Sequence, residues 1–240
     1  MTETIFDMSG VYGGELFSPP GATVLDFKAL NGTNCYCAAE SADAVRNTVA
    51  AGRTQLPGMK LNWIDTGDYH YLTAILMESV CEPFELLLYD NHSDRQALAF
   101  EQPGMLSCGS WVQWALDHNP NLRTVRWVNG DGVLSTTPNS SGSEMAATTI
   151  GASLPLYLSI DLDILGVRDF TTDWNQGSMT FNGLKSSLIK EAGRRKIHGI
   201  DICGGLTAAK GALSSDLTKN KALRLALREY ILENFNTTSL

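Results

Sequence analysis

The sequence predicts an α/β fold of three layers, in which helices cover both faces of a mainly parallel sheet. Two observations support this prediction: short apolar runs alternate with segments of helical spacing, and several of these runs are apolar almost throughout. Continuous apolar runs are typical of strands buried on both faces, and strand–helix alternation is typical of parallel sheets. We expect a single domain over residues 1–240, because this length is within reach of one large α/β unit.

The individual elements follow from the positions of these runs. The segments predicted to be strands are, in order, Ala22–Phe27, Leu61–Asp65, Phe84–Asp90, Arg123–Val128, Leu154–Ile160 and Lys196–Ile202. Helices are predicted where apolar residues recur on one helical face, at Leu72, Ile75, Leu76 and Val80, at Val112, Ala115 and Leu116, and at Leu223, Leu227, Tyr230 and Ile231. The stretch Asn129–Ser153 is rich in Gly, Ser and Thr. It predicts a long loop, either at the surface or as a wall of a site at the carboxyl edge of the sheet.

Composition narrows the class of function. The formal net charge of −8 argues against a nucleic-acid partner and against an anionic membrane surface, because both select clustered Lys and Arg. Residues 1–10 show no basic stretch followed by an apolar run, and no apolar run is long enough to span a bilayer. The five cysteines lie mostly in apolar stretches, which indicates reduced thiols. We therefore expect a cytoplasmic protein with a small-molecule substrate.

Metal-binding side chains gather where three of the predicted strands end. We call the three segments at these strand ends pieces. The first follows Leu61–Asp65 and contains His70, the second lies at the end of Phe84–Asp90 and contains Asp90, His92 and Asp94, and the third follows Leu154–Ile160 and contains Asp161 and Asp163. In an extended strand end, residues two apart point the same way, so the side chains within a piece can converge. Two like charges 4 Å apart repel by about 4 kcal/mol at an effective dielectric constant of 20, so four converging aspartates require cations. Two histidines with four carboxylates form a hard, oxygen-rich set that suits manganese.

These pieces resemble the motifs of the arginase or ureohydrolase family, GGDHS, DAHxD and SxDxDxxDP. They occur in the same order, as Thr66–His70 (TGDYH), Asp90–Asp94 (DNHSD) and Ser159–Asp163 (SIDLD). The resemblance implies an arginase-like α/β/α fold with a centre of two Mn²⁺ ions, bridged by Asp90 and Asp161. It also implies a homo-oligomer.

The reaction that the resemblance implies is hydrolysis of a C–N bond in a guanidino, amidino or formimino compound by a metal-bridging hydroxide. Two divalent ions that share a water lower its pKa towards about 7 and so supply hydroxide at neutral pH. Asp161 and Asp163 are then the catalytic residues, and Asp163 is placed to take up the proton of the hydroxide.

The sequence departs from the family at two positions that matter for the substrate. Gly204 stands where guanidinium-cleaving members have a Glu that binds the substrate, and Cys108 stands where arginase has a proton-shuttling His. A glycine cannot form a bidentate pair with guanidinium, so we do not expect free arginine to be the substrate. Asp173 and Glu144 are candidates for a substitute substrate-binding carboxylate.

Two other functions fit the same ligands. One is amide hydrolysis, as in the deacetylases that resemble this fold distantly, although such a site needs a His pair that the sequence does not offer. The other is a metal-binding protein that has lost catalysis, because Gly204 and Cys108 replace two active groups.

Trp111 and Trp174 are candidates to line the pocket, although aromatic residues more often pack in the core.

Overall fold

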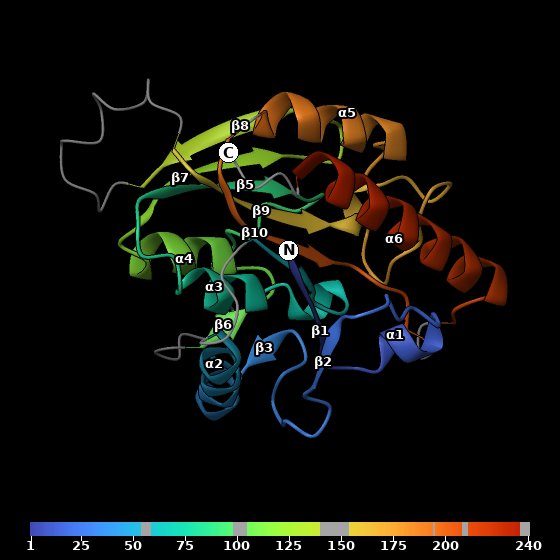
Figure 1. The fold of residues 1–240 in the computed structure, drawn as a ribbon, viewed down its shortest axis with the longest axis horizontal. Helices are drawn as coiled ribbons and strands as arrows, with labels where there is room; N and C mark the ends of the chain where they lie inside the picture. The colour runs from blue at the N-terminus through green and yellow to red at the C-terminus, as the bar shows by residue number, and fades with distance from the viewer. Residues whose placement is uncertain (54–58, 98–104, 140–153, 194, 208–210, 236–240) are drawn as a thin grey trace.

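The central element of the molecule is one large twisted sheet (Figure 1). The computed structural model describes residues 1–53, 59–97, 105–139, 154–193, 195–207 and 211–235. Within them, eight strands pair in the order β2-β1-β4-β10-β9-β5-β7-β8. Their bounds are β1 Thr2–Asp7, β2 Thr23–Asp26, β4 Lys60–Trp63, β5 Phe84–Tyr89, β7 Leu122–Val128, β8 Leu134–Pro138, β9 Leu156–Asp161 and β10 Ile197–Cys203. Neighbouring strands are parallel except β8, which pairs antiparallel with β7.

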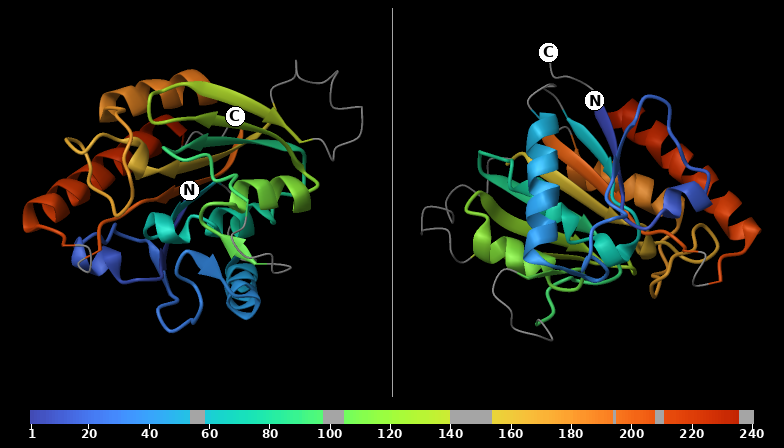
Figure 2. Two further views of the ribbon diagram at one scale, coloured as in Figure 1. Left: turned by 180° about the vertical axis from the view of Figure 1, so that it is seen from behind. Right: turned by 90° about the horizontal axis from the view of Figure 1, so that it is seen from below.

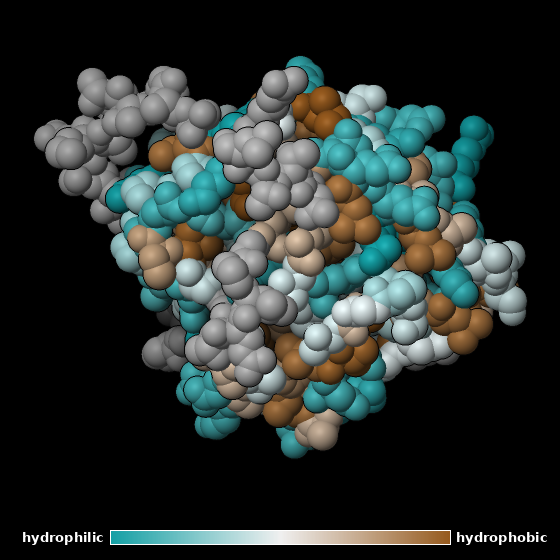
Figure 3. Space-filling view, in the orientation of Figure 1, coloured by the Kyte–Doolittle hydropathy of each residue, from teal (hydrophilic) through white to brown (hydrophobic). Residues whose placement is uncertain are grey.

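Helices cover both faces of the sheet and complete three layers (Figures 1 and 2). Their bounds are α1 Val11–Gly14, α2 Ala39–Arg53, α3 Leu72–Met77, α4 Trp111–His118, α5 Phe181–Ala192 and α6 Ser214–Phe235. Buried side chains of α2, α3 and α4 join one apolar cluster with the sheet, and those of α1, α5 and α6 join another. On the face seen in Figure 3, apolar side chains lie in small areas among hydrophilic ones. The predicted three-layer α/β/α fold is therefore confirmed.

The predicted elements are present, with one correction. All six predicted strands and all three predicted helices form, each within a few residues of the expected bounds. The prediction of a loop throughout Asn129–Ser153 was wrong for Leu134–Pro138, which forms the edge strand β8. This strand is mostly exposed, so it has no apolar face for periodicity to detect. A turn closed by the hydrogen bond from Gly132 N to Asn129 O joins this strand to β7. The rest of the predicted loop, residues 140–153, is not among the residues that the structure describes.

The strand order places the site. The strands β4, β10, β9 and β5 are adjacent and parallel, so their carboxyl ends meet at one edge of the sheet. The register pairs Cys203 with Asp161 and Tyr89 with Ile160, which brings the residues after β5 beside the end of β9. A small antiparallel pair, β3 Tyr36–Cys37 and β6 Leu106–Ser107, lies near this edge. Among the described residues, no helix is long and apolar enough to cross a membrane.

Candidate metal centre

All six predicted ligands line one pocket at the carboxyl edge of the sheet. The pocket has a volume of about 300 Å³, and its lining consists of Cys35, Tyr36, Gly67, His70, Asp90, His92, Asp94, Gln96, Ser107, Cys108, Gly109, Asp161, Asp163 and Trp174. Neither Lys nor Arg is among these lining residues. The ligands divide into two neighbouring groups, one around His70 and one around His92.

The first group surrounds the imidazole of His70, which is buried. Its Nδ1 lies 3.1 Å from Asp90 Oδ2, 3.1 Å from Asp94 Oδ2 and 3.6 Å from Asp161 Oδ2. A single ring nitrogen cannot donate to three oxygens at once, and Asp90 Oδ2 accepts no hydrogen bond of normal geometry from the described residues. His70 Nε2 lies 2.8 Å from Ser159 Oγ, which fixes the ring with Nδ1 facing the carboxylates. This arrangement fits a cation beside His70 Nδ1.

The second group surrounds His92. Its Nδ1 lies 2.8 Å from Asp163 Oδ2 and 3.5 Å from Asp90 Oδ1. The backbone N–H of Asn91 donates to Asp163 Oδ1 at 3.0 Å, and that of His92 donates to Asp90 Oδ1 at 2.6 Å. Asp90 therefore directs one oxygen to each group.

The ligands converge through turns, which corrects the expectation of an extended strand end. The strand β5 ends at Tyr89, and Asp94 has a left-handed backbone with φ of 48°. The indole Nε1 of Trp111 donates to Asp94 Oδ2 at 2.6 Å. Asp163 lies in the 3₁₀ turn Leu162–Ile164, and its backbone N–H donates to Asp161 Oδ1 at 2.9 Å. In an extended strand, the side chains of His92 and Asp94 would point to the same side. In these turns, His92 contacts Asp163 and Asp94 contacts His70.

The electrostatics of the metal-free site favour bound protons, because buried carboxylates repel each other. Burial, followed by the charges of Asp163 and Asp90, raises the pKa of Asp161 to about 7. Burial and Asp90 raise the pKa of Asp163 to about 6. Hydrogen bonds to Asp163 and Asp90 raise the pKa of His92 to about 10. Burial opposes charge on His70, but Asp90 and Asp94 outweigh it and raise its pKa well above the ordinary value. The residues thus fit divalent cations, which would replace these protons.

Gly204 and Cys108 are the two predicted departures from the family motifs. Gly204 has a left-handed φ of 92°, and a Cβ there would lie 2.6 Å from Asp161 Oδ1. Position 204 therefore has no room for a side chain, and its correspondence to a substrate-binding Glu stays a prediction. Cys108 lines the pocket, and burial raises the pKa of its thiol, so it is a neutral thiol.

Of the two candidate substrate-binding acids, Asp173 is the one that the structure describes, and it does not line the pocket. Asp173 lies on the loop before α5, where its Oδ1 accepts from the backbone N–H of Thr207 at 3.0 Å, and it is absent from the pocket lining. Its carboxylate is therefore used to join two loops, which sequence spacing cannot show. Glu144 lies outside the described residues.

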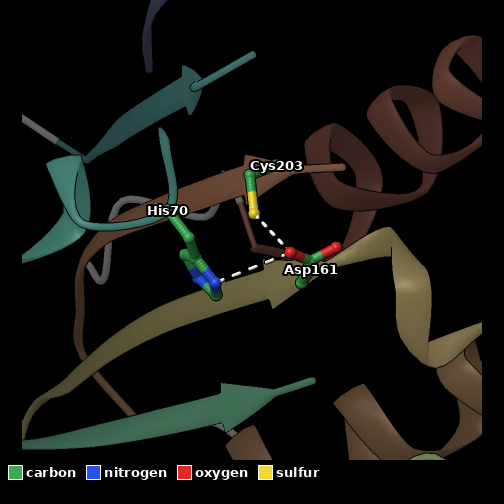
Figure 4. Close-up of side chains that lie close together, drawn as sticks. All are labelled: His70, Asp161 and Cys203. Atoms are coloured by element: carbon green, nitrogen blue, oxygen red, sulfur yellow. Dashed lines mark hydrogen bonds and ion pairs between the residues drawn. The ribbon is translucent and has the colours of Figure 1, made fainter. Parts of the chain in front are cut away.

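Three further residues shape the site. Trp174 lines the pocket, and its Nε1 donates to Asp68 Oδ1 at 2.9 Å. Trp111 is fully buried and holds Asp94, so it acts behind the site and does not line it. Cys203 is fully buried, and its Sγ lies 3.0 Å from Asp161 Oδ2 (Figure 4). The sequence contains no signal for Cys203, because the contact depends on β10 being the neighbour of β9.

Comparisons with known proteins agree with the fold. No protein-family model matches the chain. A Thermotoga maritima protein described as uncharacterized is 25% identical over 202 residues, which cover 83% of this chain and 78% of that protein. Among solved structures, a hypothetical agmatinase from Burkholderia thailandensis is similar with a TM-score of 0.62 and 13% identity, covering 99% of this chain and 88% of that one.

Two Bacillus subtilis structures are similar to a comparable degree. Formimidoylglutamase has a TM-score of 0.60 and 12% identity, covering 95% of this chain and 85% of that one. Arginase has a TM-score of 0.61 and 15% identity, covering 97% of this chain and 98% of that one. At these identities the likeness shows the fold, which is arginase-like.

Proposed function

We propose that this chain is a metal-dependent hydrolase that cleaves a C–N bond of a guanidino, amidino or formimino compound, with two Mn²⁺ ions as its cofactors. The observation that carries the proposal is the convergence of four aspartates and two histidines on one pocket that has neither Lys nor Arg in its lining. Like charges at such separations are stable together only with protons or cations between them. The arginase-like fold of the chain supports the choice of reaction.

The ligand groups suggest an assignment of residues. His70, Asp94 and Asp161 would hold one ion, His92 and Asp163 would hold the other, and Asp90 would be shared, because it directs an oxygen to each group. Asp161 is proposed as the second shared ligand on the resemblance. Two such ions supply an activated water at neutral pH. Asp163, held by Asn91 through one oxygen, presents the other to the pocket and is proposed to accept a proton there.

The volume of the pocket and the glycine at position 204 support a small substrate other than free arginine. A volume of about 300 Å³ lies at the small end of the range for ligand sites. The acidic side chains of its lining are all proposed metal ligands, and Trp174 supplies an apolar wall. Gly204 excludes the bidentate carboxylate that binds guanidinium elsewhere in the family. We therefore propose an amidino, formimino or substituted guanidino compound in preference to arginine.

Amide hydrolysis of the deacetylase type is disfavoured by the histidines. The chain has four, and the two in the pocket, His70 and His92, face carboxylates as ligands. His118 stacks on Trp114 at the end of α4, and His198 lies beside Glu82. None is left for the pair that such a mechanism uses as base and acid.

The test is metal reconstitution followed by a substrate panel. Protein loaded with Mn²⁺ should hold about two ions per chain, as a two-metal site requires, and should release ammonia, urea or formamide from one class of guanidino, amidino or formimino compound. Arginine should be turned over poorly, with kcat/KM below about 10⁴ M⁻¹ s⁻¹. Fewer than about half an ion per chain would reject the dinuclear centre. Two ions without turnover of any compound would favour lost catalysis, and turnover of acetylated amides alone would favour the deacetylase alternative.

A further inference from the structure

We infer that Cys203 is a thiolate ligand of the ion bound beside His70, so that this position takes a softer ion, such as Zn²⁺ or Co²⁺, in preference to Mn²⁺. The inference rests on the proposed metal centre and changes the chemistry of one of its two positions. Its basis is a compact group of three buried ligand atoms, from His70, Asp161 and Cys203, which lie within 4.8 Å of one another (Figure 4).

The sulfur of Cys203, a residue of the apolar cluster that packs under α2, α3 and α4, contacts a carboxylate at the edge of the polar site. Its Sγ lies 3.0 Å from Asp161 Oδ2, the same oxygen that lies 3.6 Å from His70 Nδ1. A buried free cysteine ordinarily behaves as a small apolar side chain. Cys203 instead completes a set of nitrogen, oxygen and sulfur atoms.

The end of β10 is built so that it approaches Asp161 closely. The register of β10 on β9 places Cys203 directly opposite Asp161. The next residue, Gly204, is left-handed, and any Cβ there would collide with Asp161 Oδ1 and with the backbone of Leu162. Glycine is therefore required for the two strand ends to lie this near each other. The same close approach of the two strand ends leaves no room for a side chain at position 204 and places the Cys203 sulfur beside Asp161.

The remaining donors agree with a thiolate at this position. His70, Asp161 and Cys203 supply one nitrogen, one oxygen and one sulfur atom. Three protein ligands of these types, with a water or a further carboxylate as the fourth, are typical of zinc sites. Metal binding deprotonates a coordinating thiol outright, and thiolate selects softer ions than carboxylate does. The position beside His92 has nitrogen and oxygen donors alone and suits Mn²⁺.

Cobalt spectroscopy of the full-length protein tests the inference, because a thiolate bound to Co²⁺ gives a near-ultraviolet charge-transfer band that oxygen and nitrogen ligands do not give. The metal-free protein is titrated with Co²⁺, and bound metal is measured by elemental analysis. The wild type should show the band, and Cys108→Ser, which changes the other buried thiol near the site, should keep it. Cys203→Ser should lose the band while it still binds cobalt, and serine can still donate to Asp161. This variant therefore separates a ligand from a residue that merely positions Asp161.

The outcomes distinguish this inference from the proposed function. Cobalt uptake by the wild type without the band, or a band that survives in Cys203→Ser, overturns the inference and leaves the metal centre intact. Failure of the wild type to bind any ion rejects the metal centre itself and the inference with it. If Cys203→Ser does not fold, X-ray absorption of the zinc-loaded wild type decides. With one zinc ion bound per chain, the spectrum should show one sulfur at about 2.3 Å from zinc, and a shell of nitrogen and oxygen alone overturns the thiolate ligand.

Discussion

Two buried charged clusters lie on either side of Gly204, and they differ in how their charges are balanced. Behind the glycine, Arg224 Nε donates to Glu15 Oε2 at 2.6 Å, and both side chains are fully buried. Asn220 donates to the other Glu15 oxygen at 3.2 Å. Arg224 also donates to the carbonyl of Gly204. In front of the glycine, four aspartates share one pocket with two histidines.

The comparison shows how a buried charge can serve structure or function. The Arg224 cluster contains one cation and one anion, and aromatic rings flank the guanidinium, with Tyr12 and Phe170 each 5.2 Å from it. Its two charges balance each other, although Arg224 Nη1 has no hydrogen-bond partner among the described residues. The aspartate cluster carries more negative than positive groups and needs protons or metal ions. We therefore expect changes in the first cluster to affect folding and changes in the second to affect metal binding.

The largest expected effect is from Asp161→Asn. This substitution keeps the size of the side chain but removes a charge that offsets the bound ions, so at least one ion should be lost. Hydrolysis of the best substrate should fall by at least about 10³-fold, which corresponds to about 4 kcal/mol. Circular dichroism should show a folded protein, because the residue lies at a strand end. Asp173→Asn, outside the pocket lining, is the control and should keep both ions. Full metal content in Asp161→Asn would contradict the assignment.

The second effect is on stability, from Glu15→Gln. Removal of one partner of a buried ion pair leaves the other charge uncompensated and costs about 3–5 kcal/mol. Chemical denaturation should detect this loss. Any folded variant should still bind the same number of ions, because Glu15 does not line the pocket. If stability is unchanged while metal is lost, the division between the two clusters is wrong.

A third effect is the pH dependence of the metal-free protein. The pKa values of Asp161 and Asp163 in the folded chain are about 7 and about 6, above the value of about 3.9 for an unfolded Asp. The folded state therefore holds protons that the unfolded state releases. The contribution of these protons to the free energy of unfolding is present at low pH and is lost as pH rises from about 4 to about 7. His92, with a pKa raised to about 10, extends the loss to higher pH.

Calorimetry checks this sign. The Tm of the metal-free protein should fall between about pH 5 and about pH 8, and added Mn²⁺ should largely remove the fall because the ions replace the protons. In the variant Asp161→Asn the slope should be shallower, since one of the titrating groups is gone. A Tm of the metal-free protein that rises over this range would show that the aspartates are already ionised and balanced.

The smallest effect is expected from Ser159→Ala. Ser159 Oγ lies 2.8 Å from His70 Nε2 and orients the ring, and loss of such a partner typically weakens metal binding by about 10- to 100-fold. The fold and the number of ions at saturating metal should not change. Competition with a metal chelator measures the affinity. Ser187→Ala, which removes a hydroxyl 3.1 Å from Tyr89 on the opposite side of the sheet, is a matched control and should leave affinity unchanged.

The sequence by itself determined the fold class and the candidate ligands. Apolar spacing is a local property, so the buried strands β5 and β9 and the buried face of α6 could be recognised from neighbouring residues alone. The candidate ligands were identified in the same way, since each group of them follows a recognisable strand, and their metal binding stays a prediction. The edge strand β8 was missed because it is exposed and carries no apolar pattern.

The tertiary structure decided which candidate ligands lie together and what surrounds them. Strand order is set by packing between distant segments, so the contact of Cys203 with Asp161, and that of Trp111 with Asp94, cannot be inferred from spacing. Turns, and not the strand period, decided that Asp90 faces both groups. The closeness of Gly204 to Asp161 is likewise a contact between neighbouring strands. Local sequence thus specifies the donor types, while the packing of strand ends specifies their geometry, because a metal centre is made of residues far apart along the chain.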